Sequence, residues 1–190
     1  MTATILDPKT ALIVIDLQKG IATLPMIHPV ADVVNQASRL TAAFRKHGLP
    51  VVLVNVTGSA PGRTEQPRRT GELPADWAEL LPALGHQPDD ILVSKQTWGA
   101  FARTDLAGRL KALAVTQIVL CGIATSIGVE STARQAYEAG FHVTLATDAM
   151  TDLDAAAHAN SVRTIFPRLG ETAMTDEILA LLASTRMTSG

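Results

Sequence analysis

Three segments of the chain carry side chains that could do chemistry, and each follows an apolar run. Asp16 ends the run ALIVI, Lys95 follows DILVS, and the turn 121–128 follows QIVL. A carboxylate or an ammonium group is costly to bury alone, because it loses its solvating water. Buried together, Asp16 and Lys95 would satisfy each other's charge, and the carboxyl group could exchange protons with a bound molecule.

The turn 121–128 has the sequence CGIATSIG and leads from a predicted strand into a predicted helix. Backbone N–H groups at a helix start are not used within the helix, so they suit a developing oxyanion or a ligand carboxylate. Each feature also has a plainer interpretation: Asp16 as a capping residue, Lys95 as a lysine that extends to the surface, and the turn as an ordinary connection.

The elements that must position these residues alternate along the chain. Short apolar runs rich in β-branched residues predict strands at 11–16, 51–56, 90–94, 117–121, 142–147 and 172–175. Helical apolar spacing predicts helices at 30–47, 75–84, 105–113, 126–139, 155–165 and 176–183. Gly48 and Gly140 are placed to end two of these helices. The segment 57–74, rich in glycine and proline, is predicted to be a long loop.

This alternation predicts an α/β fold, in which one three-layer α/β/α domain covers residues 1–190. A parallel six-stranded sheet would have helices on both faces. Ligands of such sheets bind beyond the carboxyl ends of the strands, where Asp16, Lys95 and the turn are expected to meet. A chain of 190 residues is long enough to bury one sizeable core.

Composition excludes several classes of function. No Lys/Arg cluster has interleaved aromatic residues, and the formal net charge is −2, so we expect no nucleic-acid partner. No apolar run approaches the roughly 20 residues that span a membrane, and no signal peptide is visible, so we expect no membrane association. A single cysteine favours a cytoplasmic setting. A hydrophobic share of 47% predicts a homo-oligomer, a dimer or larger.

Together, three segments resemble the isochorismatase-like hydrolase family, a cysteine hydrolase superfamily that includes isochorismatases, nicotinamidases and carbamoylsarcosine amidases. They are ALIVIDLQ, SKQTWGAF and GIATSIGVESTARQAYEAGFHVTLATDA, and the later AHANSVRTIFPRLGETAMTDEIL extends the resemblance over about residues 10–182. The resemblance implies the strand order 3-2-1-4-5-6, Asp16 and Lys95 as catalytic residues, and a cis peptide between Ile123 and Ala124.

Gly128 is where the chain departs from most of that family. The family's nucleophilic cysteine stands six residues after the first glycine of the turn motif, and counting from Gly122 gives Gly128. Cys121 precedes the turn and belongs to the predicted strand, where a cysteine is usually a small buried apolar residue. Ser126 has no visible histidine partner. The family's route through a covalent thioester is therefore not expected here.

Metal chemistry is not expected either. The metal-binding nicotinamidases carry Asp-x-His after the second strand, where this chain has VTGS at 56–59. The histidines show no ligand spacing; they are His28, His47, His86, His142 and His158. We expect no metal and no cofactor.

True isochorismatases provide the family's precedent for hydrolysis without a cysteine. The resemblance implies that Asp16 acts as a general acid toward a vinyl ether, that water attacks the oxocarbenium centre, and that Gly128 leaves space. Burial would raise the pKa of Asp16, whereas the Lys95 cation would lower it, and the sequence does not decide between them.

The substrate contacts expected around this centre come from several segments. Arg63, in the loop, is the expected anchor for a substrate carboxylate, because a guanidinium can donate two parallel hydrogen bonds. The other expected contacts are Gln18, Asn55, Trp98, Phe101, Ile123, Ala124 and Thr125.

Three hypotheses about function follow. The first is a metal-free hydrolase that acts on a small, anionic molecule through Asp16 and Lys95. The second is an amide or ester hydrolase that uses activated water or Cys121. The third is an inactive binding or assembly module, against which the Asp16–Lys95 pair argues, because a buried ion pair adds little stability to a scaffold.

Overall fold

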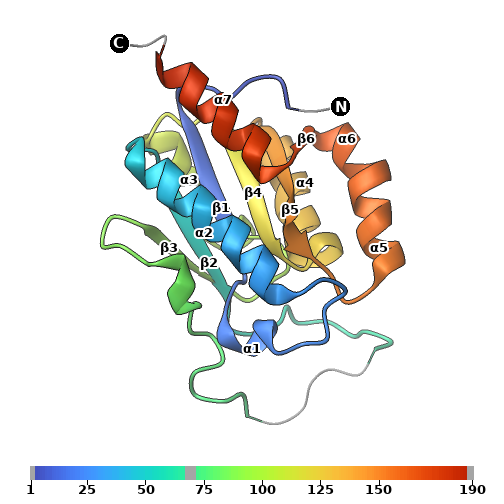
Figure 1. Cartoon of the computed structure of the whole chain (residues 1–190). Coiled ribbons are helices and arrows are strands. Elements are labelled where there is room, and N and C mark those ends of the chain that lie inside the picture. The colour runs from blue at the N-terminus through green and yellow to red at the C-terminus, as the bar shows by residue number, and fades with distance from the viewer. Residues whose placement is uncertain (1–2, 67–71, 188–190) are drawn as a thin grey trace.

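A parallel six-stranded sheet forms the middle layer of the structure, a computed structural model that describes residues 3–66 and 72–187 (Figure 1). The strand order is β3-β2-β1-β4-β5-β6, and every paired strand is parallel, as predicted. The strands are β1 (Thr10–Ile15), β2 (Val51–Val56), β3 (Ile91–Lys95), β4 (Gln117–Ile123), β5 (His142–Thr151) and β6 (Glu171–Ala173).

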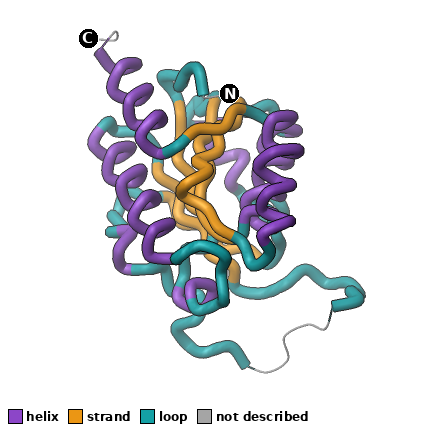
Figure 2. The backbone as a smooth tube through the Cα atoms, turned by 45° about the vertical axis from the view of Figure 1, so that its right-hand side comes forward, coloured by secondary structure: helices purple, strands orange, loops and turns teal. Residues whose placement is uncertain are grey.

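Helices cover both faces of this sheet, as Figure 2 shows. Helices α2 (Val30–Lys46) and α7 (Thr175–Met187) pack on one face. On the other face lie α3 (Leu106–Ala112), α4 (Glu130–Glu138) and α6 (Phe166–Leu169). Shorter elements complete the chain: α1 (Lys19–Ala22), η1 (Pro82–Leu84), η2 (Thr125–Val129), α5 (Ala155–Asn160) and η3 (Ser161–Ile165). No helix within the described residues is long and apolar enough to cross a membrane.

Strand β1 is central in the sheet, and all six of its residues are buried. Leu12 and Val14 pack in the cluster beneath α2 and α7, whereas Ile13 and Ile15 pack in the cluster on the opposite face. A strand covered on both faces must be apolar at every position, which explains the continuous run that ends at Asp16.

Helix α2 shows why the helical predictions succeed where one face is buried. Its buried residues recur at helical spacing and form one stripe toward the sheet: Val33, Ala37, Leu40, Thr41 and Phe44. The helix ends at Lys46, and Gly48 follows with a φ angle of +64°, as expected of a helix-ending glycine.

Several predicted boundaries shift, and one predicted element is wrong. The segment 75–84 was expected to be a helix, but only Pro82–Leu84 forms a short 3-10 turn. The carbonyl groups of Trp77 and Glu79 instead accept hydrogen bonds from the backbone of Gly20 and Lys19. These tertiary bonds use the acceptors that a helix would need.

The strands β4 and β5 extend beyond their predicted ends. Their register shifts from Leu120 opposite Leu145 to Gly122 opposite Met150, so β5 contains extra residues that bulge out of the pairing. The predicted helices 126–139 and 155–165 are each divided, because π-helical turns occupy Thr125–Val129 and Ser161–Ile165. Such turns often occur at functional sites.

Gly122 gives a first test of this arrangement. Its φ angle is +120°, and a Cβ atom built there would lie 2.0 Å from the carbonyl oxygen of Ile15. We expect Gly122→Ala to lower the free energy of unfolding by about 3 kcal/mol or more, because backbone must move. Urea unfolding measures this change.

The matched control is Gly108→Ala in α3, where an added Cβ meets nothing within 4 Å. An exposed helical position should gain about 0.5–1 kcal/mol from alanine. Equal stabilities for the two variants would contradict the close approach of β4 to β1.

Candidate active site

Asp16 lies where the chain leaves the carboxyl end of β1. Its φ angle is +51°, in the left-handed region that residues other than glycine rarely adopt. The Asp16 N–H donates to the Val54 carbonyl at 2.9 Å, and its carbonyl accepts from the Gln18 N–H at 2.9 Å. Such backbone strain costs about 1–3 kcal/mol and is concentrated at functional sites.

Lys95 ends β3, two strands away from β1, and its side chain reaches the Asp16 carboxylate. The Nζ atom donates to Asp16 Oδ2 at 2.7 Å and to the Thr97 carbonyl at 3.2 Å. The two side chains are only 1% and 8% exposed, for Lys95 and Asp16 respectively. The structure therefore brings together the two charged side chains that the sequence analysis selected.

Burial dominates the electrostatics of Asp16. Loss of water raises the pKa of Asp16 from 3.8 to about 6, even though the charge and the hydrogen bond of Lys95 both lower this pKa. The second carboxyl oxygen, Oδ1, is buried and has no hydrogen-bond partner among the described residues. A carboxyl group with a pKa near neutral pH is suited to give and take a proton.

Gly128 lies directly beside this carboxyl group. A Cβ atom built on Gly128 would be 3.4 Å from Asp16 Oδ2 and 2.9 Å from Ile15 Cγ2. Any side chain at this position would therefore enter the space next to Asp16. The position at which the family resemblance places a nucleophilic thiol carries no side chain in this chain, and even a Cβ atom there would require Ile15 Cγ2 to shift.

The turn after β4 begins with a cis peptide bond between Ile123 and Ala124, as the resemblance implied. The Ser126 N–H donates to Oδ2 of the buried Asp152 at 2.6 Å, and Oδ1 of Asp152 accepts from the Leu153 N–H at 2.8 Å. One of the N–H groups that could receive an anionic ligand is thus already used by a carboxylate of the protein.

Helix α4 holds the segment that follows Lys95. The Ala100 N–H donates to Thr132 Oγ1 at 3.1 Å, and the Phe101 N–H donates to Gln135 Oε1 at 3.0 Å. Thr132 also donates to the Gly128 carbonyl at 2.7 Å. The same helix therefore positions the lysine segment and the turn around Gly128.

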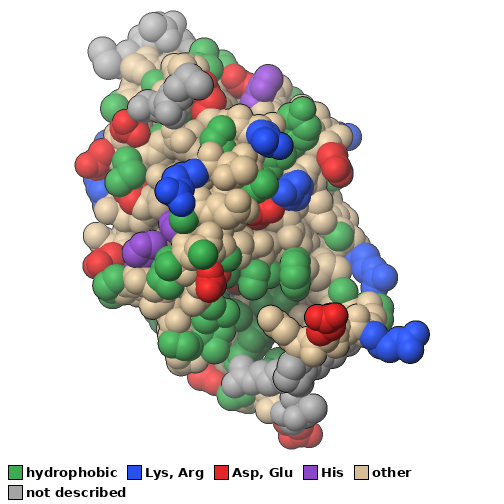
Figure 3. All heavy atoms as spheres, turned by 90° about the vertical axis from the view of Figure 1, so that its right-hand side faces the viewer, with side chains coloured by type: hydrophobic (Ala, Val, Ile, Leu, Met, Phe, Trp, Pro, Cys, Tyr) green, Lys and Arg blue, Asp and Glu red, His purple; other side chains and the backbone are tan. Residues whose placement is uncertain are grey.

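Asp16, Lys95 and Gly128 line one cavity of about 250 Å³ at the carboxyl edge of the sheet. Apolar side chains form most of its walls. Figure 3 shows apolar side chains gathered around a hollow in the lower part of the face of the molecule that it presents. The lining comprises Asp16, Ile21, Leu24, Met26, Val56, Gly58, Ser59, Trp77, Lys95, Thr97, Trp98, Ile123, Ala124, Ile127, Gly128 and Leu153.

A family model described as "Isochorismatase domain" matches residues 10–177. The chain belongs to the isochorismatase family. An uncharacterized isochorismatase family protein of Bacillus subtilis, YwoC, is 44% identical over 178 residues, which cover 90% of this chain and 93% of that protein. The phenazine biosynthesis protein PhzD of Pseudomonas fluorescens is 27% identical over 185 residues, with 92% and 87% covered.

Solved structures agree with this assignment. The structure of an isochorismatase family protein from Burkholderia thailandensis superposes with a TM-score of 0.91 at 41% sequence identity. The match covers 94% of this chain and 98% of that one. The chain is accordingly a hydrolase of the isochorismatase family with the three-layer fold described above.

Within this isochorismatase-family hydrolase, some of the expected substrate contacts line the cavity. Trp98, Ile123 and Ala124 do so, together with Asp16, Lys95 and Gly128. Thr125 is buried behind them, and its hydroxyl group donates to the Thr151 carbonyl at 3.1 Å.

Four further expected contacts, besides Thr125, lie outside the lining of the cavity. The Gln18 amide donates to the carbonyls of Val56 and Trp77, at 3.0 and 3.1 Å, and accepts from the Val56 N–H. Asn55 bonds Ala78 and Ser94 in a similar way. Both amides fasten loops to strand ends.

Phe101 packs against Phe141, with ring centroids 5.8 Å apart, on the side of the sheet covered by α4. Arg63 is exposed in the loop. The other arginines of that loop, Arg68 and Arg69, lie outside the described residues.

Cys121 is fully buried in β4 and belongs to the core cluster beneath α2 and α7. Burial and the nearby Asp148 carboxylate raise the pKa of its thiol far above the usual range. Because only a thiolate is a strong nucleophile, this cysteine is a poor candidate for covalent catalysis.

Sequence reasoning missed most of the cavity wall. Leu24, Met26 and Leu153 come from connections with no periodic pattern, and Trp77 comes from the segment that was predicted to be a helix. One signal in the sequence could have found part of this wall. Leu24 and Met26 are apolar residues in the connection that follows the catalytic candidate Asp16. A Cβ atom built on Gly20 would lie 1.9 Å from Trp77 Cδ1, so this glycine admits the indole ring.

Among residues 3–66 and 72–187, no group of three His, Cys, Asp or Glu side chains is arranged to hold a metal ion. The expectation of metal-free chemistry stays a prediction. His28 and His158 do lie together, with ring centroids 5.0 Å apart, and each bonds a threonine hydroxyl.

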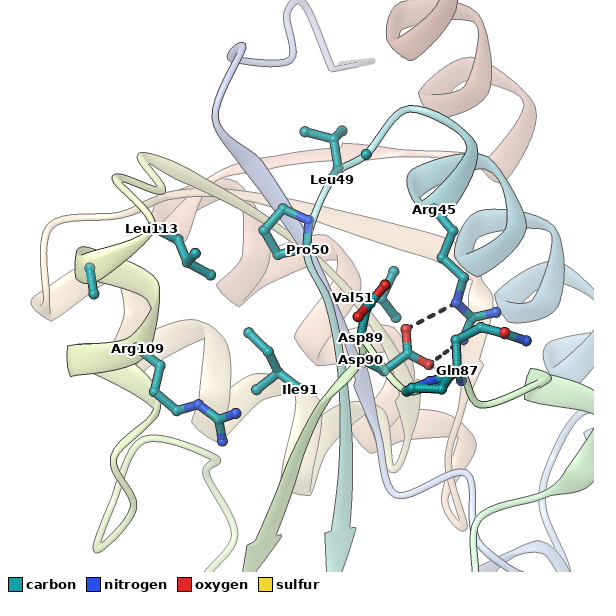
Figure 4. Close-up of a pocket in the computed structure, with 13 residues that line it drawn as sticks. Arg45, Leu49, Pro50, Val51, Gln87, Asp89, Asp90, Ile91, Arg109 and Leu113 are labelled. Carbon is teal, nitrogen blue, oxygen red and sulfur yellow. Dashed lines mark hydrogen bonds and ion pairs between the residues drawn. The ribbon is translucent and has the colours of Figure 1, made fainter.

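A larger hollow of about 710 Å³ lies at the opposite edge of the sheet, beside the amino ends of β2 and β3 (Figure 4). Arg45 and Asp90 point toward each other there and form two hydrogen bonds of 3.0 and 2.7 Å. Arg109 donates to the Leu92 carbonyl at 3.2 Å. This hollow is separate from the carboxyl edge that carries Asp16 and Lys95.

The buried pair makes a testable contribution to stability. We expect Lys95→Met to destabilise the fold at pH 8 by about 3–5 kcal/mol, because it leaves the Asp16 carboxylate buried without its cation. Lys95 lowers the pKa of Asp16, so this pKa is higher in the variant. A protonated carboxyl costs less to bury, and the loss should therefore shrink as the pH falls to 5.

Urea unfolding of wild type and variant at both pH values measures this effect. The double variant Asp16→Asn/Lys95→Met, which removes both charges, is the control and should lose less stability at pH 8. A deficit that is the same at pH 5 and pH 8 would show that Asp16 does not titrate as described.

Proposed function

We propose that this hydrolase cleaves its substrate with Asp16 as the proton donor and water as the nucleophile, without a covalent thioester. The observation that carries the proposal is the Asp16 carboxyl group: its pKa is raised to about 6, its Oδ1 atom has no hydrogen-bond partner, and its Oδ2 atom lies 3.4 Å from where a Cβ atom on Gly128 would stand. The Cys121 side chain is fully buried in the core and does not line the cavity.

A vinyl ether is the bond for which such a site is suited. Asp16 gives its proton to the terminal enol carbon, which leaves an oxocarbenium ion at the carbon bonded to oxygen. Water adds to that carbon and returns a proton to the Asp16 carboxylate. The resulting hemiketal breaks its bond to the leaving oxygen and yields a ketone and an alcohol, so that atoms and charge balance.

Lys95 acts as a positioning residue in this proposal. Its ammonium group holds Oδ2 of Asp16 at 2.7 Å, so Oδ1 is the oxygen that meets the substrate. Gly128 supplies space, because a Cβ atom there would lie 3.4 Å from the same carboxyl group. General acid catalysis of this kind contributes about 10²–10⁴-fold to a rate.

The second hypothesis, an amide or ester hydrolase, uses the same residues differently. Asp16 would have to be ionised and act as a base toward water, with Lys95 stabilising the carboxylate. The version that uses Cys121 is disfavoured by the burial of that thiol. The third hypothesis, an inactive module, is disfavoured by the unpartnered buried oxygen of Asp16, which costs a scaffold stability.

The remaining expectations stay proposals: a small-molecule substrate, no cofactor, a cytoplasmic setting and self-association. Several large apolar side chains are exposed and are available for contact with a second copy, among them Ile5, Leu92 and Tyr137.

Substitution of Asp16 tests the proposed proton donor. We expect Asp16→Asn to lower kcat by about 10²–10⁴-fold on any substrate that the wild type hydrolyses, because an amide cannot donate the proton. The assay covers isochorismate, nicotinamide and carbamoyl substrates, with product formation followed by liquid chromatography.

Cys121→Ala is the matched control and should keep kcat within about twofold, as should treatment with iodoacetamide. Full activity of Asp16→Asn would refute the proton donor, and inactivation by iodoacetamide would favour the thiol. Absence of turnover on the whole panel would favour the inactive module.

The pH dependence separates an acid from a base. If protonated Asp16 is required, kcat/KM should be level below about pH 6 and fall about tenfold per pH unit above it, because the pKa of Asp16 is raised to about 6. A carboxylate that activates water predicts the opposite slope. Initial rates measured from pH 4.5 to 8.5 at low substrate concentration distinguish the two, and a profile that rises through pH 6 contradicts the proposed acid.

A further inference from the structure

The cationic group of the cavity, Lys95, is already paired with a carboxylate of the protein. Lys95 donates to Asp16 Oδ2 at 2.7 Å and to a backbone carbonyl at 3.2 Å, so two of its three N–H bonds are used. It is the only Lys or Arg among the described residues that line the cavity. A substrate carboxylate would find only the third N–H bond of this one ammonium group, whose charge is already balanced by Asp16.

The turn after β4 is occupied in the same way. The Ser126 N–H donates to Oδ2 of Asp152 at 2.6 Å, and Asp152 is only 2% exposed. An anion placed at this N–H would meet a buried carboxylate instead of an open donor. Burial of a second negative charge beside Asp152 or Asp16 is costly, because neither water nor a free cation compensates it.

The walls favour apolar substrate atoms. Indole rings of Trp77 and Trp98 and the aliphatic chains of Ile21, Leu24, Met26, Ile127 and Leu153 surround a space of about 250 Å³. Ligand pockets for drug-sized molecules measure about 300–1,000 Å³, so the group that enters here is smaller. Two buried side-chain atoms of lining residues have no hydrogen-bond partner among the described residues: Oδ1 of Asp16 and the uncharged indole N–H of Trp77.

We propose that the substrate group bound in this cavity is uncharged: a small apolar ring or chain with one proton-accepting atom aimed at Asp16. The inference rests on the proposed function for the role of that atom, and it replaces the expectation of an anionic substrate. The charge preference itself follows from the paired cation and the apolar walls.

Two probe molecules of equal shape test this preference. In 4-nitroacetophenone the nitro group is uncharged, and in 4-acetylbenzoate a carboxylate of the same size replaces it. At pH 5, where Asp16 is mostly protonated and 4-acetylbenzoate is still ionised, we expect the neutral probe to bind the wild type at least tenfold more tightly, as measured by calorimetric titration and ligand-observed NMR. Equal affinities, tighter binding of 4-acetylbenzoate, or no binding of either probe would overturn the proposal.

A charge placed on the wall should change this ratio. Leu24 lines the cavity but belongs to neither core cluster, so its substitution leaves the core intact. Leu24→Lys supplies an unpaired ammonium group and should improve the relative affinity of 4-acetylbenzoate at least tenfold. Leu24→Gln adds polarity without charge and should keep the wild-type ratio. A lysine variant whose ratio matches that of the glutamine variant would contradict the proposed cavity electrostatics.

Binding is measured without turnover, so this test is separate from that of the proton donor. If Asp16→Asn stays active while the wild type prefers the neutral probe, the proposed acid is wrong and the charge preference stands. If Asp16→Asn is inactive while the wild type prefers 4-acetylbenzoate, the charge preference alone is wrong.

Discussion

The buried contact between Lys95 and Asp16 is the constraint on which the site depends. Neither charge could remain at the carboxyl edge of the sheet alone, because each has lost nearly all of its water. Their distance of 2.7 Å also links the ends of two strands that are not neighbours, β1 and β3. The burial that this pair requires raises the pKa of the Asp16 carboxyl group, and a carboxyl group with such a pKa is suited to proton transfer.

The sequence predicted the sheet well, because the signal was local. Strands covered on both faces, such as β1 after its first residue, are continuously apolar, and parallel order follows from alternation with helices. The charged strand ends at Asp16 and Lys95 could then be placed at one edge. The false helix at 75–84 arose because its carbonyl groups bond the segment after Asp16, which is a tertiary preference that local spacing does not record.

The sequence does not predict which of two opposing effects on a side chain is the stronger. Burial raises the pKa of Asp16 and Lys95 lowers it, and only the folded geometry shows that burial is the stronger effect. Gln18 and Asn55 were expected to line the pocket; their amides bond loop carbonyls, and their contact with substrate stays a prediction. A polar side chain near a site can serve the loop or the ligand, and sequence alone does not distinguish these uses.

The cavity wall near Trp77 is attached to the sheet mainly through its backbone. Carbonyl groups of Trp77 and Glu79 accept from the backbone of α1, and the Gln18 amide bonds the first of them again. These bonds do not involve the side chains that face the cavity. Those side chains can therefore be substituted while the backbone of the wall keeps its conformation. The proposed substrate preference and the proposed proton transfer therefore depend on different parts of this fold, so that the first can change in evolution without disturbing the second.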